Sequence, residues 1–198
     1  MIDVVEIDPD TTEAAKKFFG LKESPRLNII HDDARMFLNS AVKNRKGAYD
    51  AIYNDAFSSA CAMSPTLSTL EAAEAAYGLL DDDGVYIVNT ISSFEGKKSA
   101  FFRAEYKTIS AVFGGVYAFY AKEGPGADDV RNIMIVATKD KKDIREAKSA
   151  YLANGGKKEI AALMDNYWDR EVKTADVKIL TDDYSPVAYY AAAACDAM

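Results

Sequence analysis

Acidic side chains gather where the first apolar stretches of this chain end. Glu6 and Asp8 follow the first stretch, Asp32 and Asp33 follow the second, and Asp55 follows the third. A short run of branched apolar residues is typical of a buried strand, and ligands of parallel sheets bind at the carboxyl ends of the strands. We therefore expect three strands to deliver carboxylates to one rim.

Three of these acids have a chemical role at such a rim. In a nucleotide-binding sheet, a carboxylate at the end of the second strand accepts hydrogen bonds from both ribose hydroxyls. The opening stretch of this chain has the character of such a second strand, and Glu6 is the candidate. Asp33 is placed to accept a hydrogen bond from an adenine amino group, with Ile7 packing on the ring. Asp55 would then face the reactive end of the ligand.

The other polar residues in these positions suggest plainer roles. Acids after strands commonly cap the next helix, and we expect Asp8 and Asp32 to do only that. His31 is the one histidine of the chain, and we expect it to be hydrogen-bonded to a neighbouring acid rather than to act as a base. The sequence contains no glycine-rich phosphate loop, because "GPG" at 124–126 lies between late strands, and no cluster of metal ligands.

The elements that would position these residues alternate between strand and helix. Four strands are predicted up to residue 91, namely 2–7, 26–30, 48–55 and 85–91, and a helix follows each of them. This alternation predicts βαβ units in a mainly parallel, doubly wound sheet. Two further strands, 115–121 and 132–139, have only a short link between them and are expected to form an antiparallel hairpin.

Local patterns predict where two of the helices lie and which faces they bury. In the first helix, Phe18 and Phe19 share an apolar face with two alanines. Ser68 and Glu71 have the spacing of a capping box before another helix. The late segment 180–187, "LTDDYSPV", is either a turn or a C-terminal segment that folds over the site, and we favour the turn.

Composition limits the classes of function. The chain has 198 residues, which suits one domain over 1–198, and a net charge of −7. That charge argues against a nucleic-acid partner, which requires clustered cations, and suits a cationic small molecule better. No apolar run approaches the roughly 18 residues of a membrane span. Cys61 and Cys195 do not make a disulfide framework, so we expect reduced thiols and a cytoplasmic protein.

Four successive motifs resemble those of the spermidine synthase family, the polyamine aminopropyltransferases. They are "VVEIDP", "DDARMFL", "YDAIYNDAF" and "SPTLSTLEAAEAAYGLLDDDGVYIVN", and the similarity runs over residues 2–139. It is closest to the spermidine synthase-like branch of the family. The resemblance implies the Rossmann-like fold of S-adenosylmethionine-dependent methyltransferases, with the closing antiparallel hairpin.

The resemblance also implies residue roles and a reaction. Glu6 matches the ribose-binding glutamate, Asp33 and Ala34 match the adenine-binding pair, and Asp55 matches the catalytic aspartate. The family transfers an aminopropyl group from decarboxylated S-adenosylmethionine to an amine, usually putrescine, and releases methylthioadenosine without a metal. The partners implied are thus a nucleoside donor and an amine acceptor. Ser58 and Asn89, which follow the third strand and end the fourth, are weaker candidates for contacting the substrate.

Two departures from the family pattern matter. The family usually has a second acid three residues after the catalytic aspartate, where this chain has Ser58, which puts putrescine as the acceptor in doubt. The family also has a first strand and a glycine-rich turn before the segment that matches 2–7. Without that strand two sheet edges would lack partners. We expect that the chain is a fragment, the alternatives being that the two halves close directly on each other or that another chain supplies the strand.

Two further functions remain open from the sequence. A methyltransferase on the same fold would use S-adenosylmethionine, although the acidic rim suits the decarboxylated donor better. A non-catalytic binding or assembly module would bind no nucleotide and would form a stable oligomer, with Tyr189 and Tyr190 as expected contacts. A homodimer is compatible with the enzymatic function as well.

Overall fold

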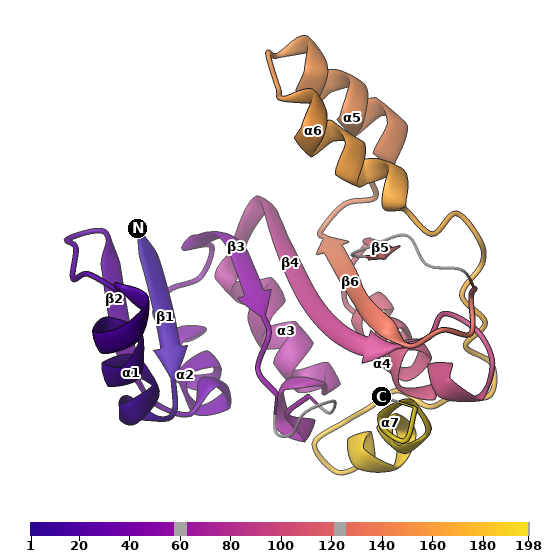
Figure 1. The fold of residues 1–198 in the computed structure, drawn as a ribbon, viewed down its shortest axis with the longest axis horizontal. Helices are drawn as coiled ribbons and strands as arrows, with labels where there is room; N and C mark the ends of the chain where they lie inside the picture. Colours follow the sequence, from indigo (N-terminus) through magenta and orange to yellow (C-terminus); the bar gives the residue numbers. More distant parts are fainter. Residues whose placement is uncertain (58–62, 121–125, 198) are drawn as a thin grey trace.

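The first two strands form a small sheet of their own. The computed structural model describes residues 1–57, 63–120 and 126–197 and is shown in Figure 1. Strands β1 (Ile2–Glu6) and β2 (Leu27–His31) are parallel, with Glu6 opposite His31 at their carboxyl ends. The register brings the two predicted strand ends to one edge.

The other strands form a mixed four-stranded sheet in the order β3-β4-β6-β5. Strand β3 (Tyr49–Asn54) is parallel to β4 (Leu80–Ser92), and β6 (Arg131–Thr138) is antiparallel to both β4 and β5 (Gly115–Tyr120). The predicted closing hairpin is therefore confirmed. In Figure 1, β1 and β3 run in the same direction, so that their carboxyl ends face the same side of the molecule.

Helices follow the strands as the alternation predicted. The α-helices of the described residues are α1 (Pro9–Phe19), α2 (Ala34–Ala41), α3 (Leu70–Leu79), α4 (Ala100–Ser110), α5 (Ile144–Ala153), α6 (Lys158–Ala161) and α7 (Val187–Cys195). Short 3-10 helices are η1 (Pro65–Leu67), η2 (Lys97–Ser99) and η3 (Ala162–Asn166). Helices α3 and α4 lie behind the four-stranded sheet, and α5 and α6 project away from it as a pair (Figure 1). Among the described residues no helix is long and apolar enough to cross a membrane.

The two sheets do not close directly on each other, so that alternative is wrong. Ile2 donates its backbone N–H to Arg26 beside β2. Since successive residues of a strand point their N–H and C=O groups to opposite edges, the groups of Asp3 and Val5 point away from β2. Side chains connect the sheets instead, because Tyr49 at the start of β3 donates a hydrogen bond of 2.6 Å to Asp3.

The main core belongs to the larger sheet. Its buried members run from Met63 to Ala191 and include Phe101 and Phe102 of α4, both fully buried. The β1-α1-β2 unit contributes none of the described core residues, and Phe19 at the end of α1 is 86% exposed. The predicted apolar face of α1 therefore stays largely open, because only a two-stranded sheet lies beside it.

Cys195, the last residue of α7, is disulfide-bonded. The expectation of reduced thiols is therefore wrong. Cys61 lies outside the described residues.

Candidate active site

Glu6 ends β1 with one carboxylate oxygen engaged. Its Oε1 accepts the backbone N–H of Asp8 at 2.8 Å, and Asp8 in turn caps α1 by accepting the N–H of Asp10 at 2.9 Å. Within the described residues nothing donates to Glu6 Oε2. Ile7, between the two acids, is 70% exposed. The local turn thus fixes the carboxylate while leaving one oxygen and one apolar side chain available to a ligand.

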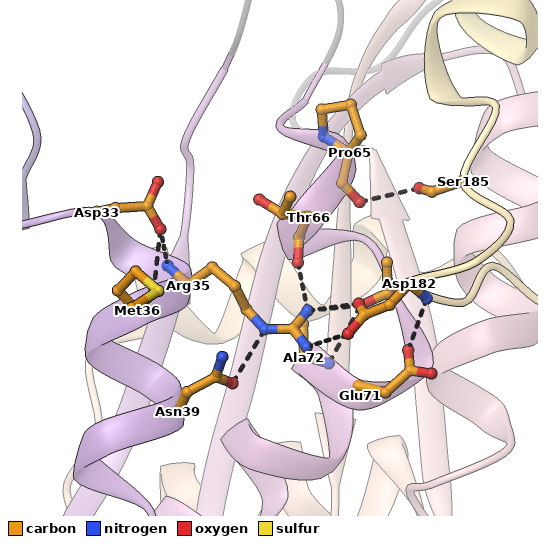
Figure 2. A network of polar contacts seen from close by, with 11 residues as sticks. Asp33, Arg35, Met36, Asn39, Pro65, Thr66, Glu71, Ala72, Asp182 and Ser185 are labelled. Carbon is orange, nitrogen blue, oxygen red and sulfur yellow. Dashed lines mark hydrogen bonds and ion pairs between the residues drawn. The ribbon is translucent and has the colours of Figure 1, made fainter.

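Asp33 is the N-cap of α2. Its Oδ1 accepts the N–H groups of Arg35 at 2.8 Å and Met36 at 3.0 Å, whereas no described group donates to Oδ2 (Figure 2). Asp32 was expected to cap this helix, which is wrong, because its carboxylate instead accepts the N–H of Asp33. The half-buried Asp33 can therefore hold the helix with one oxygen and accept a ligand hydrogen bond with the other.

His31 faces a different partner from the one expected. Its Nε2 lies 3.1 Å from the hydroxyl of Thr12 in α1, so its neighbour is a threonine and not an acid. Two hollows lie in this part of the molecule. One of about 510 Å³ includes His31, and another of about 370 Å³ lies around Arg35 and Asp182. Neither is lined by Glu6 or Asp55, so the place of a ligand is inferred from the strand ends.

Asp55 follows β3 directly and is oriented by β4. Asn89 donates from its side-chain amide to Asp55 Oδ1 at 2.8 Å, while no described group donates to Oδ2. The side chain of Asp55 is exposed at the carboxyl end of the sheet. A carboxylate held in this way can accept a proton or attract a cation. Asn89, a weaker candidate for a substrate contact, is thus hydrogen-bonded to Asp55, the candidate catalytic residue. Ser58 lies outside the described residues.

A buried polar layer lies on the core side of Asp55. Asn54, its neighbour in β3, donates to the hydroxyl of Tyr86 at 3.0 Å. Burial raises the pKa of Tyr86, and it raises the pKa of Glu105 in α4 to about 8, against the opposing effect of nearby hydroxyls. Glu105 Oε2 has no hydrogen-bond partner among the described residues. Glu105 is therefore uncharged at neutral pH.

The residues that sequence reasoning missed are charged and far apart in the chain. Arg35 forms an ion pair with Asp182 beside the Asp33 cap (Figure 2). The segment 180–187 does form a turn, since Thr181 and Tyr184 exchange backbone hydrogen bonds. Ser185 of the same segment donates to the carbonyl of Pro65 in η1. The turn is therefore confirmed, while the folding of this segment over the site stays a prediction. The described residues include no group of three acids, histidines or cysteines placed to bind a metal.

Comparison with known proteins identifies the family of the chain. Residues 1–145 match the family model of the spermine/spermidine synthase domain. The polyamine aminopropyltransferase of Vibrio vulnificus (strain CMCP6) is 27% identical over 190 residues, which are 93% of this chain and 60% of that protein. The chain thus spans less than two thirds of the length of this relative.

Solved structures share the fold at lower identity. A spermidine synthase in complex with the transition state analogue AdoDATO matches with a TM-score of 0.59 and 19% identity, over 96% of this chain and 61% of the other. Human methyltransferase-like protein 13 in complex with SAH matches with a TM-score of 0.61 and 19% identity, over 89% and 75%. These likenesses confirm the predicted Rossmann-like fold of the S-adenosylmethionine-dependent methyltransferase type.

Proposed function

The chain belongs to the spermine/spermidine synthase domain family, and from this premise we propose that it supports aminopropyl transfer. The proposed donor is decarboxylated S-adenosylmethionine, the acceptor is an amine, and the released product is methylthioadenosine. The observation that carries the proposal is the Asp55–Asn89 pair at the carboxyl ends of β3 and β4.

The proposed reaction is a direct displacement. The amine nitrogen forms a bond to the carbon next to the sulfonium, and the carbon–sulfur bond breaks with its electron pair going to sulfur. Methylthioadenosine leaves as a neutral thioether, so the protein must align the amine and keep it unprotonated. Asp55 accepts the proton that the nitrogen loses, while the hydrogen bond from Asn89 keeps the other carboxylate oxygen in place.

The proposed donor site lies at the ends of β1 and β2. Glu6 accepts the ribose hydroxyls through the oxygen that its own turn leaves free. Asp33 accepts from the adenine amino group through Oδ2, the adjoining Ala34 contacts the base, and the exposed Ile7 packs on the ring. Support comes from the free oxygen of each acid and from the AdoDATO and SAH bound by the fold relatives. No metal takes part in the proposed reaction.

Asp33→Asn tests the donor site, because asparagine caps helices as well as aspartate does. Its Oδ1 can still hold α2, but an NH₂ group replaces the oxygen that would accept from adenine. We expect calorimetry to show micromolar binding of methylthioadenosine to the wild-type chain and binding weaker by about tenfold or more in the variant. A folded wild-type chain that binds no methylthioadenosine would refute the donor assignment.

Asp55→Asn tests the chemistry, with Asp50→Asn as the matched control. Both acids are exposed and belong to the same stretch of chain, and both changes remove one negative charge. We expect Asp55→Asn to abolish aminopropyl transfer while methylthioadenosine binding is largely kept, and Asp50→Asn to leave both unchanged. Transfer that persists in Asp55→Asn contradicts the catalytic role.

The last part of the proposal concerns the partners, the assembly and the location of the protein. The partners are a nucleoside donor and an amine, the assembly is a homodimer, and the location is the cytoplasm. The acceptor is left as an amine rather than putrescine, because Ser58 stands where the family usually has an acid. A thiol count on protein isolated under native conditions tests the location, because a disulfide at Cys195 is unusual in the reducing cytoplasm.

A further inference from the structure

A single arginine near the start of α2 holds groups from three other segments. Arg35 donates from Nη1 to the carbonyl of Thr66, the hydroxyl of Thr69 and Asp182 Oδ1, each at 2.8 Å. Its Nη2 donates to Asp182 Oδ2 at 2.6 Å, and its Nε to Asn39 at 3.1 Å. The side chain is only 12% exposed. Figure 2 shows the guanidinium enclosed by these acceptors.

The partners of Arg35 connect the C-terminal turn with the chain that follows β3. Thr69 caps α3, and its hydroxyl donates to the same carboxylate oxygen of Asp182 that Arg35 binds, at 2.9 Å. The backbone N–H of Asp182 donates to Glu71 in the first turn of α3. Burial alone would raise the pKa of Asp182, but the hydrogen bonds from Arg35 and Thr69 outweigh burial and lower it. Asp182 is therefore a charged anchor.

Arg35 also belongs to the candidate donor site through its backbone. Its N–H is one of the two groups that Asp33 Oδ1 accepts. The same residue thus fixes the proposed adenine-binding carboxylate on one side and the C-terminal turn on the other. A fork of two parallel hydrogen bonds to a carboxylate fixes direction as well as distance.

We propose that Arg35 and Asp182 are positioning residues for the donor site: by clamping the start of α2 to the C-terminal turn and to α3, they set where Asp33 meets the nucleoside. Neither side chain contacts the nucleoside, and the turn contributes to binding from a distance. This inference rests on the proposed function. It assigns a role to Asp182, which lies outside the family motifs that the sequence displays, and to the side chain of Arg35, which lies within one of them.

A second clamp of the same geometry provides a matched control. Arg103 of α4 holds Asp176 through both guanidinium nitrogens and also donates to the carbonyl of Lys173. This pair ties the same C-terminal segment to α4 and contacts neither α2 nor the strand ends. Breaking it should loosen the segment without moving Asp33.

The test compares Asp182→Asn with Asp176→Asn. Each change leaves a half-buried arginine with a neutral partner, so both variants should lose some thermal stability. We expect calorimetry to show methylthioadenosine bound about tenfold or more weaker by Asp182→Asn and unchanged by Asp176→Asn. Equal affinity in both variants, with the wild type binding normally, overturns the clamp and leaves the proposed function intact.

A ligand-free measurement keeps the two proposals separate. Amide hydrogen exchange at Arg35 and Met36, the two N–H groups held by Asp33, should quicken in Asp182→Asn and stay unchanged in Asp176→Asn. If the wild type binds no methylthioadenosine, the proposed function fails. The amide exchange rates alone then show whether the Arg35–Asp182 pair holds the start of α2 in place. Unchanged exchange at both amides in Asp182→Asn refutes the clamp whatever the ligand result.

Discussion

Glu105 is a buried acid behind the candidate active site, and its environment makes stability depend on pH. Burial raises its pKa from the usual 4.5 to about 8. The folded protein therefore binds this proton more tightly than the unfolded chain. The stabilisation is fully present below pH 4.5 and is lost as pH rises towards 8.

Glu105→Gln should remove this dependence, because glutamine is neutral at every pH. We expect the variant and the wild type to have similar unfolding free energies near pH 4.5 and to diverge as pH rises. At pH 8 the variant should be more stable by about 3–5 kcal/mol, measured by urea unfolding. Glu74→Gln, at an exposed position of α3, is the control. A constant difference between wild type and Glu105→Gln from pH 4.5 to 8 would show that Glu105 titrates normally.

Residue types at strand ends were predictable, but their partners were not. The positions of Glu6, Asp33 and Asp55 followed from apolar runs that end in acids, and the structure places each at a carboxyl end. Arg35 and Asp182 are 147 residues apart, and no local pattern links them. Only the folded chain brings such pairs together, so spacing and periodicity cannot reveal them.

At the scale of elements, helix starts show what local patterns can miss. The sequence offered Ser68 and Glu71 as a capping box, but the cap of α3 is Thr69, whose hydroxyl accepts the N–H of Ala72. Ser68 instead donates to the carbonyl of Ser64. The cap can shift by one residue because serine and threonine are both favourable N-cap residues, and tertiary contacts to Thr69 decide between them.

The start of the closing hairpin depends on a glycine. A Cβ at Gly114, just before β5, would lie 2.3 Å from the backbone oxygen of Lys139, just after β6. That oxygen also accepts the N–H of Gly114, so neither strand can move without losing the bond. We expect Gly114→Ala to lower the unfolding free energy by about 1–3 kcal/mol in urea titrations.

Gly126→Ala is the matched control for the hairpin, because its Cβ would meet nothing closer than a side-chain oxygen at 3.4 Å. It should change stability by no more than about 0.5 kcal/mol. If the two variants unfold at the same urea concentration, the close approach at Gly114 does not constrain the hairpin.

At the scale of the molecule, the chain consists of two sheets connected by side chains. The alternation of strands and helices predicted the parallel pairs and the final hairpin, because each depends on local periodicity and link length. How β1 and β3 face each other could not be derived, since it depends on contacts of Asp3 with Arg45 and Tyr49, which lie 42 and 46 positions further along the chain. The hydrogen bond from Tyr49 is also the main reason that the pKa of Asp3 is lowered.

Amide exchange should reveal the open edge of β1. The N–H groups of Val4 and Glu6 point towards β2, whereas those of Asp3 and Val5 point away from it. We expect NMR-detected exchange at Asp3 and Val5 to be faster than at Val4 and Glu6, with the alternation serving as its own control. Uniform protection along β1 would mean that this edge is paired in solution.

The long reach of the Arg35–Asp182 pair has a consequence for how the protein is made. When Arg35 is added to the growing chain, the 147 residues up to Asp182 remain to be translated. At about 5–20 residues per second, the start of α2 waits roughly 7–30 s for its partner. Throughout that time the guanidinium of Arg35 lacks its carboxylate partner, and the start of α2 can reach its final form only after Asp182 has been synthesised.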